Sequence, residues 1–200
     1  MFTNIFHNVW PMLFIFTIII VSIRLVYIFY NKEKFVFYKE LLMFCFIIYI
    51  LLLYYIVTFQ DSNYGTNNYI PFKEIFRYKI TSKLFIKNVL GNILLFVPFG
   101  IFASHYVKNK KVYITLILTL IVSFSIEFTQ SIIGRTADVD DIILNLFGGL
   151  LGYMLYREFN TITNKLPKFM KTEIFLDLFS LFLILVLVFL SFKYNFWRFF

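Results

Sequence analysis

Six long apolar stretches separated by short polar segments dominate the pattern of this chain. They run at about residues 10–30, 40–58, 89–107, 112–133, 138–156 and 174–192. A helix that crosses the hydrocarbon core of a bilayer needs about 20 mostly apolar residues, and each stretch is close to that length. The pattern therefore predicts an all-α fold, a polytopic transmembrane helical bundle with about six spans.

The segment between the second and third stretches has a different pattern. It opens with "DSNYGTNNYIPF", whose asparagines, glycine and proline favour irregular backbone. From Phe72 to Lys87, apolar residues recur at three- and four-residue steps with basic residues between them. This spacing predicts an amphipathic helix in the headgroup layer between spans two and three. The alternative is a basic loop that only binds anionic lipid.

Composition and charge support a membrane protein and exclude several other classes. The chain is 60% hydrophobic with a mean hydropathy of +0.80, and its formal net charge is +8. The cations lie between the spans, where they bind anionic lipid and set topology, and no motif reads a nucleic-acid groove, so nucleic acid is not an expected partner. One cysteine permits no internal disulfide, and two histidines cannot form an imidazole metal cluster.

The distribution of lysine and arginine predicts the orientation. Ten of these residues follow spans one, three and five, whereas eight lie on the opposite side. Cations in short loops mark the cytoplasmic side, and the first loop has the greatest weight. We therefore expect both termini outside the cell, with the basic loop and the turn between spans four and five also on the outer face.

A polar stretch, "SIEFTQSIIGRTADVDDIILNLFGG" (125–149), interrupts the most apolar part of the chain. On a helix of 3.6 residues per turn, one sector of span five contains Asp138, Asp141, Asn145 and three glycines, with Asp140 nearly opposite. One side of span four carries Thr119, Ser123, Glu127, Gln130 and Ser131. The turn is short, so the two helices should be antiparallel. We expect their polar faces to meet in one recess.

Ionisable groups at this depth are costly and usually functional. Glu127 lies within its span, and Arg135 is its nearest candidate partner. The three aspartates have a purely structural alternative, because carboxylates in a first helical turn cap free N–H groups. The glycines favour close helix packing. In span three, Asn92 either projects toward the same recess or bonds a neighbouring helix, and Pro98 should kink the helix.

Three pieces read in order carry a resemblance to a known family: "NYIPF" (68–72), "NILLFVPFG" (92–100), and "EFTQ" with "GRTADVDDIILNLFGG" (127–149). The chain resembles the VanZ family over about residues 60–156. The family pattern falls on Asn68, Pro71, Asn92, Pro98, Gly100, Glu127, Gln130, Arg135, Asp138, Asp141, Asn145 and Gly149. Asp140 lies outside it.

The resemblance implies a multi-pass protein of the bacterial cell membrane that is linked to reduced susceptibility to teicoplanin and related lipoglycopeptides. It also divides the chain into two N-terminal spans (1–58), a VanZ-like core of outer loop and three spans (59–156), and a cytoplasmic loop with the last span (157–200). The candidate ligand-binding residues are Asn68, Asn92, Glu127, Gln130, Arg135, Asp138, Asp141 and Asn145.

Three functions remain open at this point. In the first, the recess binds an envelope lipid headgroup, a lipid-linked envelope precursor or the lipoglycopeptide itself. In the second, a membrane enzyme modifies such a precursor, with Glu127 or Asp141 as acid or base and Arg135 stabilising anionic charge. In the third, the protein is a scaffold. No cofactor is expected, although Asp138 and Asp141 are a candidate pair for a divalent cation.

Overall fold

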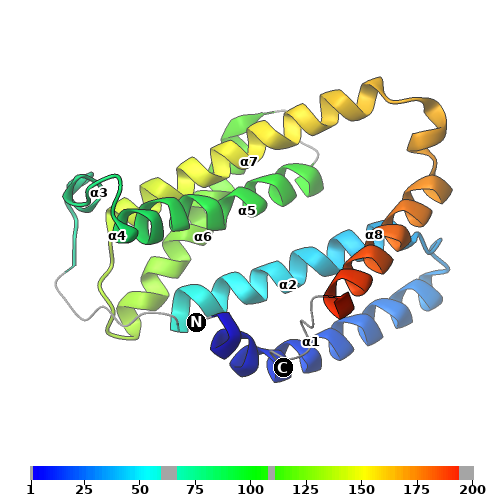
Figure 1. Cartoon of the computed structure of the whole chain (residues 1–200), viewed down its shortest axis with the longest axis horizontal. Helices are drawn as coiled ribbons and strands as arrows, with labels where there is room; N and C mark the ends of the chain where they lie inside the picture. Colours follow the sequence, from blue (N-terminus) through cyan, green and yellow to red (C-terminus); the bar gives the residue numbers. More distant parts are fainter. Residues whose placement is uncertain (1, 60–66, 108–110, 194–200) are drawn as a thin grey trace. The chain divides into compact units, whose positions relative to one another are not determined.

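The computed structural model describes residues 2–59, 67–107 and 111–193, which are almost entirely helical (Figure 1). The helices are α1 (Phe2–Asn31), α2 (Phe37–Phe59), α3 (Lys73–Arg77), α4 (Lys83–Phe85), the π-helix η1 (Ile86–Leu90), α5 (Gly91–Val107), α6 (Val112–Ile132), α7 (Val139–Lys165), the 3-10 helix η2 (Lys168–Lys171) and α8 (Glu173–Lys193). Within the described ranges, six helical segments are long and apolar enough to cross a membrane. The predicted fold class is confirmed.

Two spans are longer than hydropathy alone indicated. The third begins at Lys83, because α4 and η1 run directly into α5. The fifth, α7, continues beyond residue 156 to Lys165. No proline or glycine interrupts that extension, and α7 ends just before Leu166–Pro167, where proline disfavours helix in the preceding residue. Polar residues past the apolar stretch can therefore stay helical.

The basic segment between α2 and α5 is helical in two short pieces and does not form one helix over 72–87 as expected. Tyr78 is extended after α3, and Ser82 then begins α4 by accepting a 3.0 Å hydrogen bond from the Phe85 N–H on its side-chain oxygen. Such an N-cap starts a new helix. The extended Tyr78 and the Ser82 cap therefore divide the single helix that the amphipathic spacing predicted.

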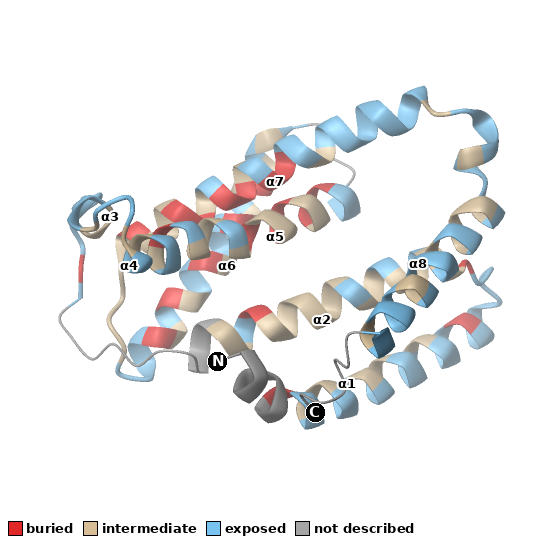
Figure 2. Cartoon of the chain, in the orientation of Figure 1, coloured by how far each residue is buried: buried red, intermediate tan, exposed pale blue. Residues whose placement is uncertain are grey.

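Helix α6 buries a polar face. Its buried residues recur about once per turn and are all polar: Thr115, Thr119, Ser123, Glu127 and Gln130. Figure 2 shows buried positions gathered along α5, α6 and α7. In a membrane the lipid is as apolar as leucine, so burying apolar side chains between helices gains little. Small polar residues stabilise the bundle because they let helices approach closely and form hydrogen bonds between them. The predicted polar side of this helix is confirmed, except that Ser131 is exposed.

Glycines bring α7 into close contact with its neighbours, as predicted. A Cβ at Gly148 would overlap the carbonyl oxygen of Ile93, and one at Gly152 would overlap that of Val97. Gly149 lies against the side chain of Thr119. Helices α5 and α7 consequently make the most extensive helix contact in the described chain. These two helices and α6 form the scaffold that positions the polar hairpin.

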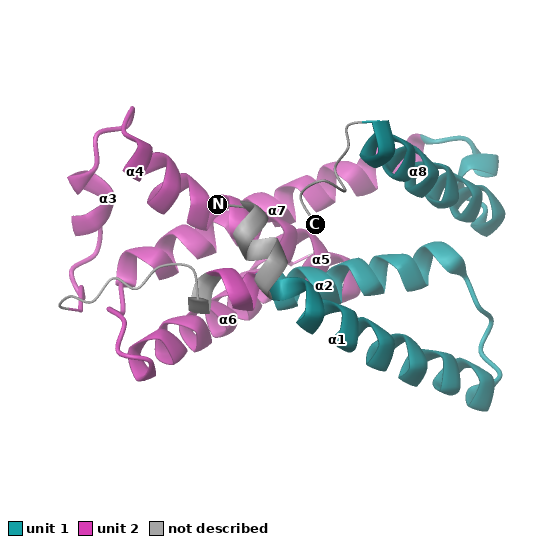
Figure 3. Cartoon of the chain, turned by 60° about the horizontal axis from the view of Figure 1, so that its bottom comes forward, with its two compact units in different colours: residues 1–52, 166–200 teal, residues 53–165 magenta. Residues whose placement is uncertain are grey.

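The chain divides into two compact units, residues 1–52 with 166–200 and residues 53–165 (Figure 3). In the first, Glu40 accepts two hydrogen bonds from Arg24, at 2.8 and 2.9 Å. Glu173 at the start of α8 pairs with Lys34 and Lys39, at 2.6 and 3.0 Å. The turn between α1 and α2 is thereby joined to α8. The second unit contains the candidate functional residues.

Candidate functional site

Asp138 connects the two helices of the polar hairpin. Its backbone N–H donates a 2.8 Å hydrogen bond to Oε2 of Glu127 in α6. Its side-chain Oδ1 accepts a 2.9 Å bond from the N–H of Asp140, in the first turn of α7. A carboxylate in this position caps the helix and suits the positive end of its dipole. Glu127 and Asp138 are thus held together where α6 ends and α7 begins.

Asn68 attaches the long loop to this hairpin. Its backbone pairs with both sides of Asp138, because the Asn68 N–H donates to the Ala137 oxygen at 3.0 Å and the Val139 N–H donates to the Asn68 oxygen at 3.1 Å. Its side-chain amide also donates to Oδ1 of Asp138 at 2.8 Å. The loop and the hairpin therefore lie together, and their place on the outer face stays a prediction.

Asp140 provides a second attachment that the sequence analysis missed. Its side chain accepts hydrogen bonds from the backbone N–H groups of Phe72, Glu74 and Ile75, at 2.5, 2.7 and 3.2 Å. Only 1% of Asp140 is exposed. These donors belong to the start of α3, where the first N–H groups of a helix have no partner within it. Asp140 therefore caps α3 from another helix.

The backbone of Phe72 is strained in the conformation in which it bonds Asp140. Its φ of 67° lies in the left-handed region, which costs a residue with a Cβ about 1–2 kcal/mol. The hydrogen bond from its N–H to Asp140 compensates for that strain. The sequence carried one usable signal in two parts. Asp140 is an acidic residue outside the polar sector of α7, and the amphipathic segment has at its start Phe72, which cannot cap the helix with its side chain.

A recess opens beside the Glu127–Asp138 pair. Its volume is about 250 Å³, and its lining consists of Tyr69, Phe124, Glu127, Phe128, Ser131, Ala137, Asp138, Val139 and Ile142. Two carboxylates therefore face a largely apolar wall. In the described chain their hydrogen bonds use Oε2 of Glu127 and Oδ1 of Asp138.

The electrostatic setting of Asp138 is unfavourable to its charge. Burial raises the pKa of Asp138, and the negative charges of Asp140 and Glu74 add to that effect, whereas hydrogen bonds from the Asp140 N–H and Asn68 oppose it. A carboxylate in these surroundings gains more from a hydrogen-bond donor or a cation than one in water does.

The other candidate residues lie near the recess but do not line it. Asp141 accepts a 2.5 Å hydrogen bond from the side chain of Asn92 in α5. Asn145 donates to Ser123 at 2.8 Å inside the α6–α7 contact. Asn92 and Asn145 thus hold helices together. For Asn92, in span three, this is the second of the two predicted alternatives, a bond to a neighbouring helix. The single recess shared by all polar residues is smaller than expected, because helix packing satisfies several of them.

Gln130 and Arg135 flank the carboxylates. Gln130 is buried on the polar face of α6. Its backbone carbonyl oxygen accepts a 2.9 Å hydrogen bond from the backbone N–H of Arg135. The Arg135 charge acts on Glu127 through space. The pairing of Arg135 with Glu127 stays a prediction.

Asp138 and Asp141, the candidate cation pair, bond to side chains of different elements. Asp138 and Asp141 hydrogen-bond to different asparagines, Asn68 and Asn92. Among the residues that the structure describes, no group of three or more His, Cys, Asp or Glu side chains is arranged to hold a metal ion. The divalent-cation site at Asp138 and Asp141 therefore stays a prediction from the sequence.

Comparisons with known proteins agree with the motifs. The family model described as VanZ/LLP1 matches residues 46–163. Protein VanZ of Enterococcus faecium is 32% identical over 102 residues, which cover 50% of this chain and 62% of that protein. The match therefore spans less than two thirds of the curated relative, and no solved structure matches the chain. Because the family model covers more than half of the sequence and contains every motif of the hairpin, this multi-span membrane protein belongs to the VanZ/LLP1 family.

Proposed function

We propose that this protein binds the polar headgroup of a lipid-linked envelope molecule, or of a lipid-anchored glycopeptide, in the recess beside Glu127 and Asp138. Such binding would contribute to the low-level resistance to teicoplanin and other lipoglycopeptides that the family resemblance implies. The observation that carries the proposal is a hollow in which two buried or half-buried carboxylates face apolar side chains.

The chemistry of the recess selects the ligand class. Ionised carboxylates only accept hydrogen bonds, so the matching groups are amines and hydroxyls. A charge-assisted hydrogen bond in a poorly solvated site is stronger than one in water. Phe124, Phe128 and Ile142 would contact the apolar part of such a ligand. Basic residues of the neighbouring loop, exposed at Lys73 and Arg77, would bind a phosphate of the same ligand.

An enzymatic role is the second candidate. Glu127 lines the recess and would act there as acid or base. Asp141 is bonded to Asn92 and lies outside the lining, so the paired-carboxylate chemistry would involve Asp138 in its place. Binding requires only the two carboxylates already present, which favours it over catalysis. Turnover of a labelled envelope lipid by purified protein, lost with Glu127→Gln, would favour the enzyme.

The recess is proposed to open toward the outside of the cell, with both termini on that side. The support is the charge distribution, since ten cations follow the apolar stretches of spans one, three and five. We expect Thr136→Cys, in a Cys45→Ser background, to react with a membrane-impermeant thiol reagent in intact cells. Thr163→Cys, near the opposite end of α7, should be protected until the cells are opened. Protection of Thr136→Cys with labelling of Thr163→Cys would reverse the orientation.

Removing one carboxylate charge should abolish the contribution to resistance. Glu127→Gln keeps the shape of the side chain but removes the charge that a donor ligand would bind, so about tenfold in ligand affinity is lost. The host should then become as susceptible to a lipoglycopeptide as a strain without the protein, and Asp138→Asn should act in the same direction. The measurement is the growth-inhibiting concentration at equal amounts of inserted protein.

Glu158→Gln is the matched control, because Glu158 is exposed on α7 beyond the recess. It should leave susceptibility unchanged. Normal resistance in the inserted Glu127→Gln and Asp138→Asn variants would leave the scaffold role and exclude binding or catalysis at the recess.

A further inference from the structure

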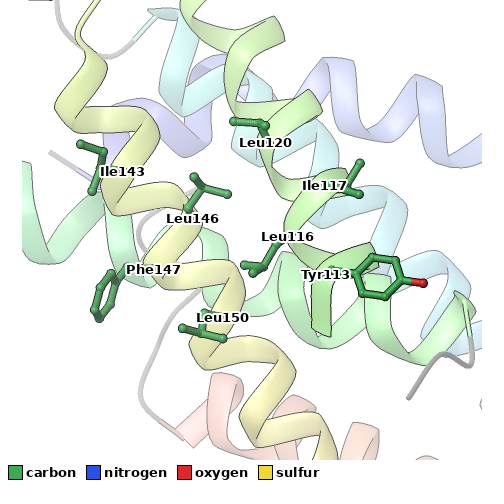
Figure 4. A pocket seen from close by; sticks show the side chains of 8 residues that line it. All are labelled: Tyr113, Leu116, Ile117, Leu120, Ile143, Leu146, Phe147 and Leu150. Atoms are coloured by element: carbon green, nitrogen blue, oxygen red, sulfur yellow. The ribbon is translucent and has the colours of Figure 1, made fainter. Parts of the chain in front are cut away.

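A second hollow lies between the same two helices as the recess. Its volume is about 450 Å³, and leucine, isoleucine, phenylalanine and tyrosine side chains of α6 and α7 line it, with none from α5. Figure 4 shows Leu116 and Leu120 of α6 and Leu146 of α7 around the space between these helices. All of these side chains lie on the side of the hairpin away from the glycine contact with α5.

The two hollows follow one another along α6 and α7, and together we call them the α6–α7 groove. Leu120, at one end of the apolar hollow, is one turn from Phe124 in the recess, and Ile143 is adjacent to Ile142. From Tyr113 to Glu127 the groove is about 21 Å long at 1.5 Å per residue. Its lining is apolar along this length and carries carboxylates only at the end formed by Glu127 and Asp138.

We propose that the α6–α7 groove holds one alkyl chain of a membrane lipid whose amine- or hydroxyl-bearing headgroup occupies the recess. The inference rests on the proposed function and adds the part of the ligand that the headgroup site leaves open. A molecule with one polar end and a long apolar remainder matches the distribution of polar and apolar residues along the groove. A helix of a second copy would have no need of two carboxylates at one end of the groove.

The groove adds selectivity more than affinity. Bilayer lipid is as apolar as the groove, so moving a chain between them gains little from the hydrophobic effect. What the groove offers is close packing around a chain, which is lost when a bulky side chain fills the space. Headgroup and chain should therefore be separable by mutation.

The test uses the full chain in lipid nanodiscs and two sets of probes. The first set consists of single-chain phosphoethanolamine and phosphoglycerol lipids with a photoreactive group on a long alkyl chain. The second set carries the same headgroups on short, water-soluble chains. We expect at least one long-chain probe to cross-link to residues 116–120 and 143–147. Leu146→Trp should reduce this yield about fivefold, whereas Ile121→Trp, exposed on α6 outside the groove, should not.

The short-chain probes separate this inference from the proposed function. Their binding should be equal in wild type and Leu146→Trp but weaker in Glu127→Gln. If Leu146→Trp leaves long-chain labelling unchanged, or labelling falls outside the groove because another helix covers it, the chain site is overturned while the headgroup site stands. If neither probe set depends on Glu127, the headgroup site fails, and the inference fails with it.

Discussion

Asp140→Asn is expected to release α3 and the loop around it from the hairpin. The aspartate accepts three backbone hydrogen bonds with both oxygens, and asparagine offers one acceptor oxygen and an NH₂ group that repels the remaining donors. Hydrogen bonds to a charged group contribute about 1.5–3 kcal/mol each, so the docked loop should lose on the order of 3 kcal/mol or more. The hydrogen bond that offsets the strained left-handed backbone of Phe72 would then be weakened or lost.

Limited proteolysis in detergent measures this release directly. Cleavage within residues 67–82 should become much faster in Asp140→Asn. The neighbouring Asp141→Asn is the control, because Asp141 bonds a side chain of α5 and none of the loop N–H groups. Equal cleavage rates in wild type and Asp140→Asn would mean that the loop is held by other contacts.

Gly148→Ala is expected to disrupt the contact between α5 and α7. The added Cβ would overlap backbone atoms of Ile93, which cannot rotate away as a side chain could. The two helices must separate, and overpacking of this kind costs about 1–3 kcal/mol or more. A shifted α7 also moves Asn145 away from Ser123 and Asp138 away from Glu127. Less folded protein should be recovered, with a lower midpoint of thermal unfolding in detergent.

Gly91→Ala provides the matched substitution in a helix. Its added Cβ would have the carbonyl oxygen of Ile86 at 3.7 Å as its nearest neighbour, an ordinary contact. Alanine also favours helix over glycine, so this variant should unfold at or above the wild-type midpoint. Similar midpoints for the two variants would contradict the close packing of α7.

The spans could be predicted from the sequence because burial in lipid imposes a length and a composition that hydropathy detects. The ends of helices were harder to predict. Helix α7 extends to Lys165 and ends before Pro167. The break between α3 and α4 depends on the Ser82 cap. Both are local features, which a hydropathy average over many residues conceals.

The polar face of α6 and the glycine contacts of α7 were also predictable, since both follow from the period of a helix. The role of Asp140 was not. A helical wheel compares residues with their own helix, whereas the partners of Asp140 are backbone N–H groups more than sixty residues away. For the same reason, the wheel placed Asn145 in a common recess, although Ser123 satisfies it inside the helix contact.

The most direct test of the central claim is native mass spectrometry of the protein released from host membranes. Binding at Glu127 and Asp138 predicts a lipid-sized adduct on the wild type and on Glu158→Gln that is lost in Glu127→Gln and Asp138→Asn. The same adduct, retained to the same extent on all four proteins, would contradict a ligand site in the recess between α6 and α7.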